Sequence, residues 1–290
     1  MSGPAGSHRG RSATAPSRGP PAEPRRRRGS RTRERRRKRR GKWISIASYN
    51  IRDGRNGGLQ SAARALGRTM VDIAVLQEVK ITDTRFATRK WAGYEILTAA
   101  AGTANCGGVA LLMRKSDEHS FAIENAKVIG PNVISCEMVT GRHKRWFIVG
   151  CYLPPSDREG VTQRMVLEAV KDRPKGTCPI VIGDLNADLD FPRDRQEEIL
   201  SSAMAGMNLT CASKGYRTRK KRRRTQGRWT FQRHENRGGG GRTWIRSKPD
   251  YFLIREQDRR KVKRCRWILP PHHNSDHRAL VVKIGGSRGG

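Results

Sequence analysis

Several familiar sequence signals are missing from this 290-residue chain. No apolar run approaches 18 residues and no signal-peptide segment is present, so the sequence predicts a soluble, intracellular protein without a membrane partner. No internal repeat is found. The six cysteines include no CxxC pair, so neither a zinc site nor a disulfide framework is predicted. They stand at positions 106, 136, 151, 178, 211 and 265.

The first 42 residues lack every aromatic side chain and every Ile, Leu and Val. They carry sixteen Lys and Arg residues against two acids, and the remainder is rich in Pro, Gly and Ser. Such a segment cannot bury enough apolar surface to offset its ordering entropy, so residues 1–42 are predicted to be a disordered basic tail. The basic blocks at 25–28 and 35–40 are typical of a nuclear-import signal or a nucleic-acid-binding arm, and a solvated tail without a specific role is the alternative. A nuclear location is therefore expected.

Acidic residues are too few to balance the basic ones, both in the tail and in the rest of the chain taken as a whole. The formal net charge is +35, and after the +14 of the tail is removed, +21 remains on residues 43–290. Residues 214–228 alone hold nine basic side chains and no acid. An excess this large favours a polyanionic partner, with nucleic acid as the first interpretation and an acidic membrane surface as the second.

The rest of the chain mixes predicted strands and helices, which indicates an α/β domain. Runs rich in β-forming residues predict strands at 43–51, 72–78, 94–98, 108–113, 133–139, 146–152, 179–186, 248–254 and 278–282. One-sided apolar patterns predict helices at 58–70, 160–171 and 193–206. Residues 228–232 and 243–245 are predicted as the two arms of a hairpin, joined by a long flexible loop.

Polar residues recur at the ends of these predicted strands. Asp184 and Asn186 are two apart on backbone predicted to be extended, so we expect both to face one side and to hold a water or a phosphate oxygen. Asp276 and His277 precede the last strand; an acid can hold a divalent metal, and a histidine can hold or move a proton. The full set is Asn50, Glu78, Tyr152, Asp184, Asn186, Thr230, Asp250, Asp276 and His277.

Five short motifs occur in order: S-Y-N (48–50), L-Q-E (76–78), G-D-L-N (183–186), P-D-Y-F-L (249–253) and S-D-H (275–277). Together they resemble the endonuclease/exonuclease/phosphatase superfamily over about residues 43–284. The resemblance implies an α/β fold, a four-layer sandwich with two central, mostly antiparallel β-sheets flanked by helices. It also implies hydrolysis of phosphodiesters with Mg²⁺, or with Mn²⁺ in its place. Residues 285–290 are expected to be a disordered C-terminal end.

The resemblance also implies a set of metal ligands. Glu78 is expected to be the principal ligand, and Asn50 and Asp276 are expected to support it. A hard cation of this kind prefers oxygen ligands and retains several waters, so one or two acids suffice.

The same resemblance implies the catalytic residues. His277, oriented by Asp250, is expected to contact the scissile phosphate or to stabilise its developing charge. Asp184 is expected to orient or deprotonate the attacking water, with Asn186 helping to place that water, and Tyr152 belongs to the same set. An Asp behind a histidine fixes the tautomer of the ring and favours its protonated form.

The residue type at position 152 indicates which branch of the superfamily the chain resembles most. DNase-like, inositol-phosphatase and sphingomyelinase branches typically carry histidine there, whereas tyrosine followed by proline is similar to abasic-site endonucleases and to endonuclease domains of non-LTR (LINE-type) retrotransposons. Thr230 and Ser275 resemble hydroxyls that contact phosphate in the retrotransposon branch. In those enzymes a hairpin at this point enters the minor groove, so its basic residues are candidate nucleic-acid contacts: Arg233, Arg237 and Arg242.

Two departures from the family pattern affect the expected activity. Arg52 stands where abasic-site enzymes often carry an acid. Retrotransposon endonucleases normally precede a reverse transcriptase, whereas this sequence ends at Gly290, which favours a truncated or domesticated copy. The sequence therefore predicts a monomeric, Mg²⁺-dependent DNA endonuclease that nicks one strand. The alternatives are a phosphoesterase acting on RNA or a phosphoinositide, and a catalytically inactive nucleic-acid-binding remnant.

Overall fold

The computed structural model describes residues 43–82, 86–101, 107–114, 121–141, 144–157, 159–213, 229–237, 241–271 and 275–285. Only the backbone is described at 86–90, 233–237 and 241–246. The basic tail, the basic run at 214–228 and the C-terminal end from 286 lie outside the described residues. The disorder predicted for the tail and for the C-terminal end stays a prediction. Within the described part of the chain, no helix is long and apolar enough to cross a membrane.

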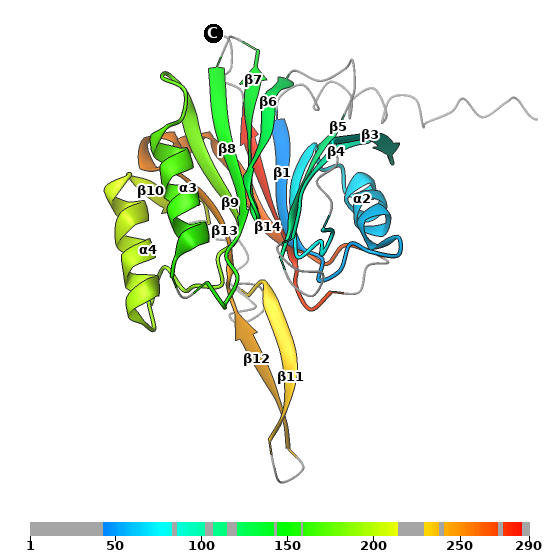
Figure 1. The fold of residues 1–290 in the computed structure, drawn as a ribbon, viewed down its shortest axis with the longest axis vertical. Coiled ribbons are helices and arrows are strands. Elements are labelled where there is room, and N and C mark those ends of the chain that lie inside the picture. Colours follow the sequence, from blue (N-terminus) through cyan, green and yellow to red (C-terminus); the bar gives the residue numbers. More distant parts are fainter. Residues whose placement is uncertain are drawn as a thin grey trace, which may run out of the picture. The chain divides into compact units, whose positions relative to one another are not determined.

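Two β-sheets form the centre of the fold (Figure 1). The first has seven strands in the order β14 (Val262–Ile268), β15 (Ala279–Gly285), β1 (Trp43–Asn50), β2 (Ile73–Gln77), β5 (Val109–Arg114), β4 (Tyr94–Ala99) and β3 (Phe86–Trp91). The second has six, in the order β10 (Leu209–Cys211), β13 (Asp250–Arg255), β9 (Cys178–Asp184), β8 (Lys144–Tyr152), β7 (Val133–Thr140) and β6 (Phe121–Gly130). The pairs β1–β2 and β8–β9 are parallel, and the other neighbours are antiparallel.

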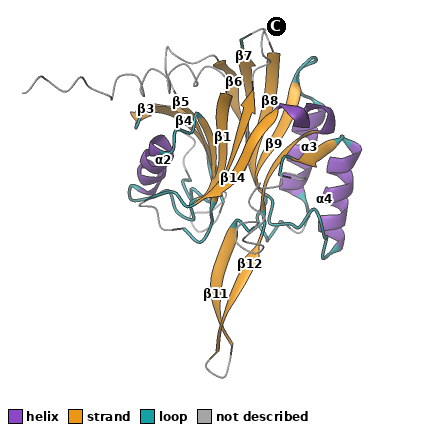
Figure 2. Cartoon of the chain, turned by 180° about the vertical axis from the view of Figure 1, so that it is seen from behind, coloured by secondary structure: helices purple, strands orange, loops and turns teal. Residues whose placement is uncertain are grey.

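Helices cover the outer faces of both sheets (Figure 2). Helix α2 (Gly58–Arg68) lies on the first sheet, and helices α3 (Val161–Lys171) and α4 (Arg195–Gly206) lie on the second. This arrangement confirms the predicted four-layer α/β sandwich with mostly antiparallel sheets. All three helices match the predicted ones to within two residues at each end.

Successive side chains on a strand point alternately to the two faces of its sheet, and this alternation produces the separate hydrophobic layers. On β1, Ile44 and Ile46 pack between the two sheets, whereas Ala47 and Tyr49 pack beneath α2. Because successive strand residues point to opposite faces, one strand supplies two hydrophobic clusters. The same pattern on β9 places Ile182 between the sheets and Val181 beneath the helices of the second sheet.

Four strands of the structure were not predicted from the sequence: β3, β6, β10 and β14. The register of β6 shifts between Glu124 and Lys127, which breaks the alternation that would mark a strand. β14 is an edge strand rich in basic residues, and β10 spans three residues. A 3₁₀ segment, η1 (Glu256–Lys261), also lay outside the predicted elements.

The predicted hairpin is present, but the loop predicted between its arms is longer than the loop in the structure. The arms are β11 (Phe231–Arg237) and β12 (Gly241–Ser247), paired from Phe231–Ser247 to Arg237–Gly241. The predicted flexible loop began at residue 233, so most of it is paired strand. The hairpin extends from the edge of the sheets at which β13 begins (Figure 1).

Gly183 permits a close approach of two strands directly before Asp184. A Cβ at this position would stand 1.9 Å from the backbone oxygen of Cys151 on β8. We expect Gly183→Ala to lower the free energy of unfolding by about 3 kcal/mol, because the clash is with a backbone atom held in the sheet. Urea unfolding measures the loss. Gly206→Ala is the matched control, since a Cβ there meets nothing within 4 Å; equal effects of the two changes would contradict the close-approach argument.

Candidate active site

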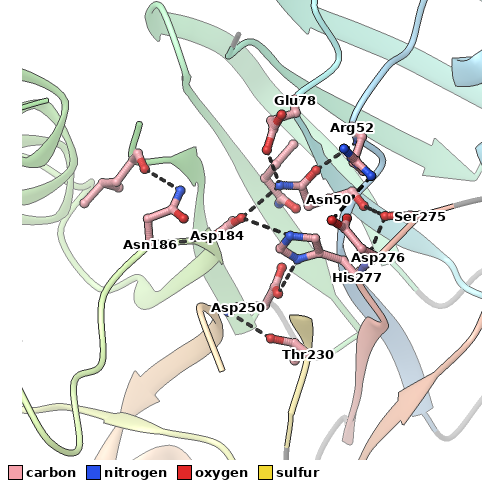
Figure 3. A network of polar contacts seen from close by, with 12 residues as sticks. Asn50, Arg52, Glu78, Asp184, Asn186, Thr230, Asp250, Ser275, Asp276 and His277 are labelled. Atoms are coloured by element: carbon pink, nitrogen blue, oxygen red, sulfur yellow. Dashed lines mark hydrogen bonds and ion pairs between the residues drawn. The ribbon is translucent and has the colours of Figure 1, made fainter. Parts of the chain in front are cut away.

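The candidate site lies at one edge of the two sheets, where several strand ends meet (Figure 3). Because β1 and β2 are parallel, Asn50 and Glu78 at their carboxyl ends reach the same edge. In the second sheet β13 begins opposite the end of β9, so Asp250 pairs with Asp184. His277 comes from the segment just before β15, the antiparallel partner of β1. Strand pairing therefore brings residues from both ends of the domain together.

Asn50 is the central hydrogen-bonding residue, and it is fully buried. Its Nδ2 donates to Glu78 Oε1 at 2.8 Å and to Asp184 Oδ2 at 2.9 Å. Its Oδ1 accepts the backbone N–H of Arg52 at 2.9 Å. One amide thus links the acid of the first sheet to the acid of the second and fixes the distance between them.

The imidazole of His277 is held from two sides. Its Nδ1 lies 3.0 Å from Asp250 Oδ2, and both residues are buried. The backbone N–H of Asp250 donates in turn to Thr230 Oγ1 at 3.3 Å. Phe231 forms a β-bridge with His277, and the two ring centroids are 5.0 Å apart. The base of the hairpin therefore helps to orient the histidine.

Buried charges change the protonation of His277 and Asp184. Burial alone would lower the pKa of His277, but the neighbouring carboxylates, that of Asp250 above all, outweigh it and raise that pKa to about 9. Burial and the charge of Asp250 raise the pKa of Asp184 to about 7, although His277 and the hydrogen bond from Asn50 oppose this. His277 is therefore protonated at neutral pH, whereas Asp184 is divided between its acid and base forms.

Ser275 and Asp276 join this cluster to β1. Ser275 Oγ donates to the carbonyl oxygen of Asn50 at 2.8 Å and accepts the backbone N–H of His277 at 3.1 Å. Asp276 Oδ2 lies 3.4 Å from Nη1 of Arg52. The other carboxylate oxygen of Asp276, Oδ1, is buried and has no hydrogen-bond partner among the residues that the structure describes. Asp276 is thus an acid with one oxygen paired and one open.

Two groups of side chains offer ligand atoms to a metal. The first is the predicted set of Glu78, Asn50 and Asp276, which presents only oxygen ligands to a hard cation. The second is Asp184, Asp250 and His277, whose ligand atoms all lie within 4.8 Å of one another. In the second group the Asp250 carboxylate already binds His277 Nδ1, and all three residues are buried. The second group is the more compact, whereas the first offers only the oxygen ligands that a hard divalent ion prefers.

Asn186 takes a position that differs from the expectation, whereas Tyr152 stands at the predicted strand end. Asn186 has a φ of 45°, so the predicted extended backbone from Asp184 to Asn186 is wrong. Its backbone N–H donates to Asp184 Oδ1 at 3.0 Å, and its Nδ2 donates to the carbonyl of Leu153 at 2.8 Å. Asn186 therefore braces Asp184 from behind. Tyr152 is buried in the core between the sheets, in register with Asp184.

The predicted nucleic-acid contacts stay predictions. Thr230 is fully buried behind Asp250, and Ser275 is partly exposed at the edge of the cluster. The side chains of the three hairpin arginines, Arg233, Arg237 and Arg242, lie outside the described residues.

Sequence reasoning missed three neighbours of the site. Lys80 Nζ lies 3.6 Å from Glu78 Oε2, Phe231 packs on His277, and Arg52 pairs with Asp276. Arg52 was visible as a departure from the family pattern. Lys80 stands only two residues after Glu78, so its contact could have been expected from the sequence, whereas the contact of Phe231 with His277 depends on the tertiary fold.

Solved structures of nucleic-acid enzymes share this fold. An AP endonuclease from Leishmania major has a TM-score of 0.61 at 17% identity, covering 85% of this chain and 89% of that one. The endonuclease domain of TRAS1, a telomere-specific non-LTR retrotransposon, has a TM-score of 0.57 at 18% identity, covering 83% and 98%. A 3′-5′ exonuclease from Neisseria meningitidis has a TM-score of 0.59 at 16% identity, covering 83% and 99%.

Two comparisons were made at the level of sequence. No curated protein matches the chain. The model of the Endonuclease/Exonuclease/phosphatase family matches residues 47–277, which include every described residue of the candidate site. The chain therefore belongs to the endonuclease/exonuclease/phosphatase family.

Proposed function

We propose that this protein is a divalent-metal-dependent DNA endonuclease that nicks one strand, as in the target nicking of retrotransposons. The observation that carries the proposal is the meeting of two groups at one edge. An oxygen-rich set lies beside a protonated histidine that is fixed by a buried carboxylate. Hydrolysis of a phosphodiester needs both, because a water must be placed and oxyanion charge must be neutralised.

Glu78, Asn50 and Asp276 are the proposed ligands of Mg²⁺, or of Mn²⁺ in its place. The open Oδ1 of Asp276 supports this assignment, since a buried carboxylate oxygen without a donor is costly unless a cation satisfies it. Bound there, the ion would polarise the phosphate and offset its charge. Asn50 connects these ligands to Asp184, so the metal group and the proton-handling group are held in one geometry.

Asp184 and His277 are the proposed proton-handling residues. The raised pKa of Asp184 makes its carboxylate basic enough to accept a proton from the attacking water. The protonated His277 would stabilise negative charge on a non-bridging phosphate oxygen, while Asp250 holds the ring in place. His277 Nε2 and Asp184 Oδ2 are 4.0 Å apart, so the two residues act on the same substrate group.

DNA is the proposed substrate. The excess of +21 outside the tail supports a polyanion. Structural neighbours include AP endonucleases and a 3′ phosphatase from Neisseria bound to product DNA hairpin. The hairpin of β11 and β12 starts beside the site, where it could contact a duplex. Thr230, Ser275 and the hairpin arginines are the proposed nucleic-acid contacts, and the basic tail supports a nuclear location.

Incubation of the purified protein with supercoiled plasmid, with Mg²⁺ or with EDTA, tests the proposed function. We expect conversion to open circles only with the metal. Plasmid that stays supercoiled under both conditions would contradict the proposal. Degradation of RNA alone, or release of phosphate from a phosphoinositide, would instead support the other phosphoesterase activities.

A protein that binds DNA without cutting it is the second candidate. Its specific support is that both acids of the metal group already face a cation, Glu78 facing Lys80 and Asp276 facing Arg52. This candidate predicts an unchanged plasmid with either Mg²⁺ or Mn²⁺, together with retained affinity in a gel shift.

The nicking rate is expected to depend on pH in a bell shape. It should rise as Asp184 loses its proton near pH 7, and fall as His277 loses its proton near pH 9. Initial rates between pH 5.5 and 10, in buffers of constant ionic strength, measure the profile. His277→Ala should remove the alkaline limb. An alkaline limb that survives this substitution would show that His277 is not the group that must stay protonated.

A further inference from the structure

Arg52 lies inside the candidate site in a strained conformation. It follows Asn50 by two residues and has a φ of 63°. Left-handed backbone is unfavourable for a residue with a long side chain, and it persists where the surroundings enforce it. Here the backbone N–H of Arg52 donates to the side chain of Asn50 at 2.9 Å. The central residue of the site therefore holds Arg52 in place.

The guanidinium of Arg52 has more N–H donors than its contact with Asp276 uses. Its Nη1 lies 3.4 Å from Asp276 Oδ2, and the side chain is 59% exposed. Among the described residues, Asp276 is the only acid that pairs with it. A guanidinium carries five N–H donors in a plane that suits two oxygens of one phosphate. Within the described part of the chain only Nη1 is paired with an acid, so the other donors can bind a second anion beside Asp276.

Asp276 is also a proposed metal ligand, so the guanidinium of Arg52 and the divalent ion would compete for its carboxylate. Its Oδ1 is buried without a hydrogen-bond partner among the described residues, and its Oδ2 faces Arg52. A divalent ion at Asp276 would repel the guanidinium and weaken the ion pair. The guanidinium would then be free to bind another anion, and a phosphodiester held by the same ion would be close to it.

We propose that Arg52 is a phosphate-binding residue, and that its ion pair with Asp276 is exchanged for a substrate phosphate when a divalent ion binds. This inference rests on the proposed function, which supplies the metal and the phosphodiester. The exchange couples the two binding events, because each favours the separation of Arg52 from Asp276. In the free protein the same ion pair keeps Asp276 partly neutralised.

Metal binding to the DNA-free protein tests the first half of the exchange. We expect Arg52→Gln to bind Mn²⁺ about tenfold more tightly than the parent in calorimetry, because a competing positive charge is removed. Arg55→Gln is the matched control. Arg55 is an exposed cation of the same loop, and it pairs with Asp53 at 2.7 Å rather than with a proposed ligand. It should leave Mn²⁺ affinity unchanged.

DNA binding with and without the metal tests the second half. The probe is a fluorescent duplex that already carries a nick, measured by anisotropy in EDTA and in Mn²⁺. The parent and Arg55→Gln should bind it more tightly in Mn²⁺. In Arg52→Gln this gain should fall about fivefold or more, because the released guanidinium is no longer there to take the phosphate.

Two results would overturn the exchange. One is an Arg52→Gln variant whose Mn²⁺ affinity is equal to or weaker than that of the parent. The other is tighter Mn²⁺ binding with the full metal-dependent gain in DNA affinity. If Arg52→Gln shows both expected differences from the parent but the parent leaves plasmid intact, the exchange is supported and the proposed nicking activity is contradicted. The two failures are therefore distinguishable.

Discussion

Replacing Glu78 with alanine is expected to abolish nicking while DNA affinity stays nearly intact. Glu78 directly follows β2, and its Oε1 is held by Asn50 at 2.8 Å. As the proposed principal ligand it would anchor the ion that offsets charge on the phosphate, so its loss should slow nicking by on the order of 10³-fold. The basic residues proposed to attract DNA are unchanged. Plasmid relaxation and gel-shift affinity should be measured side by side.

The control for Glu78→Ala is Glu198→Ala, which removes an exposed acid from α4 on the outer layer. It should leave both readouts unchanged. A Glu78→Ala protein that nicks as fast as the parent in Mg²⁺ would show that the metal is held elsewhere.

Loss of His277 is expected to be the second large effect. His277→Ala should slow nicking by about 10²–10⁴-fold, which is the usual scale for a group that stabilises an oxyanion or transfers a proton. Asp250→Asn should also slow the reaction, because Asp250 Oδ2 holds the imidazole at 3.0 Å and favours its charged form. If Asp250 acts through His277, Asp250→Asn should add little once His277 is gone.

Single-turnover rates of the two single variants and the double variant complete this cycle. Fully additive losses would mean that the two residues act separately, against the contact observed between them. Circular dichroism of each variant separates this result from loss of the fold.

Much of the fold followed from periodicity, because long elements with two packed faces leave clear patterns. β1 alternates and is rich in β-forming residues, β2 is a nearly continuous apolar run, and α3 and α4 each show one apolar side. β6 and β14 escaped prediction for local reasons. A bulge interrupts the alternation of β6, and basic residues on the exposed edge of β14 conceal its inward-facing Cys265.

The candidate site could be outlined from sequence for a different reason. The family resemblance implied that Asn50 and Glu78 share a metal site, and they are neighbours in the structure because they stand at the ends of two parallel strands. What could not be predicted were the directions of individual side chains. Asn186 was expected on extended backbone, but its left-handed φ turns it behind Asp184. The contact of Arg52 with Asp276 joins opposite ends of the domain, and no local pattern encodes it.

The most direct test of the account is the position of the metal itself. Crystals of the protein soaked in Mn²⁺ would show the ion as an anomalous diffraction peak. The account predicts the peak among the oxygens of Glu78, Asn50 and Asp276, with Arg52 turned away from Asp276. A peak among Asp184, Asp250 and His277 instead would contradict it, because those residues would then be ligands and could not serve as the proposed base and oxyanion partner.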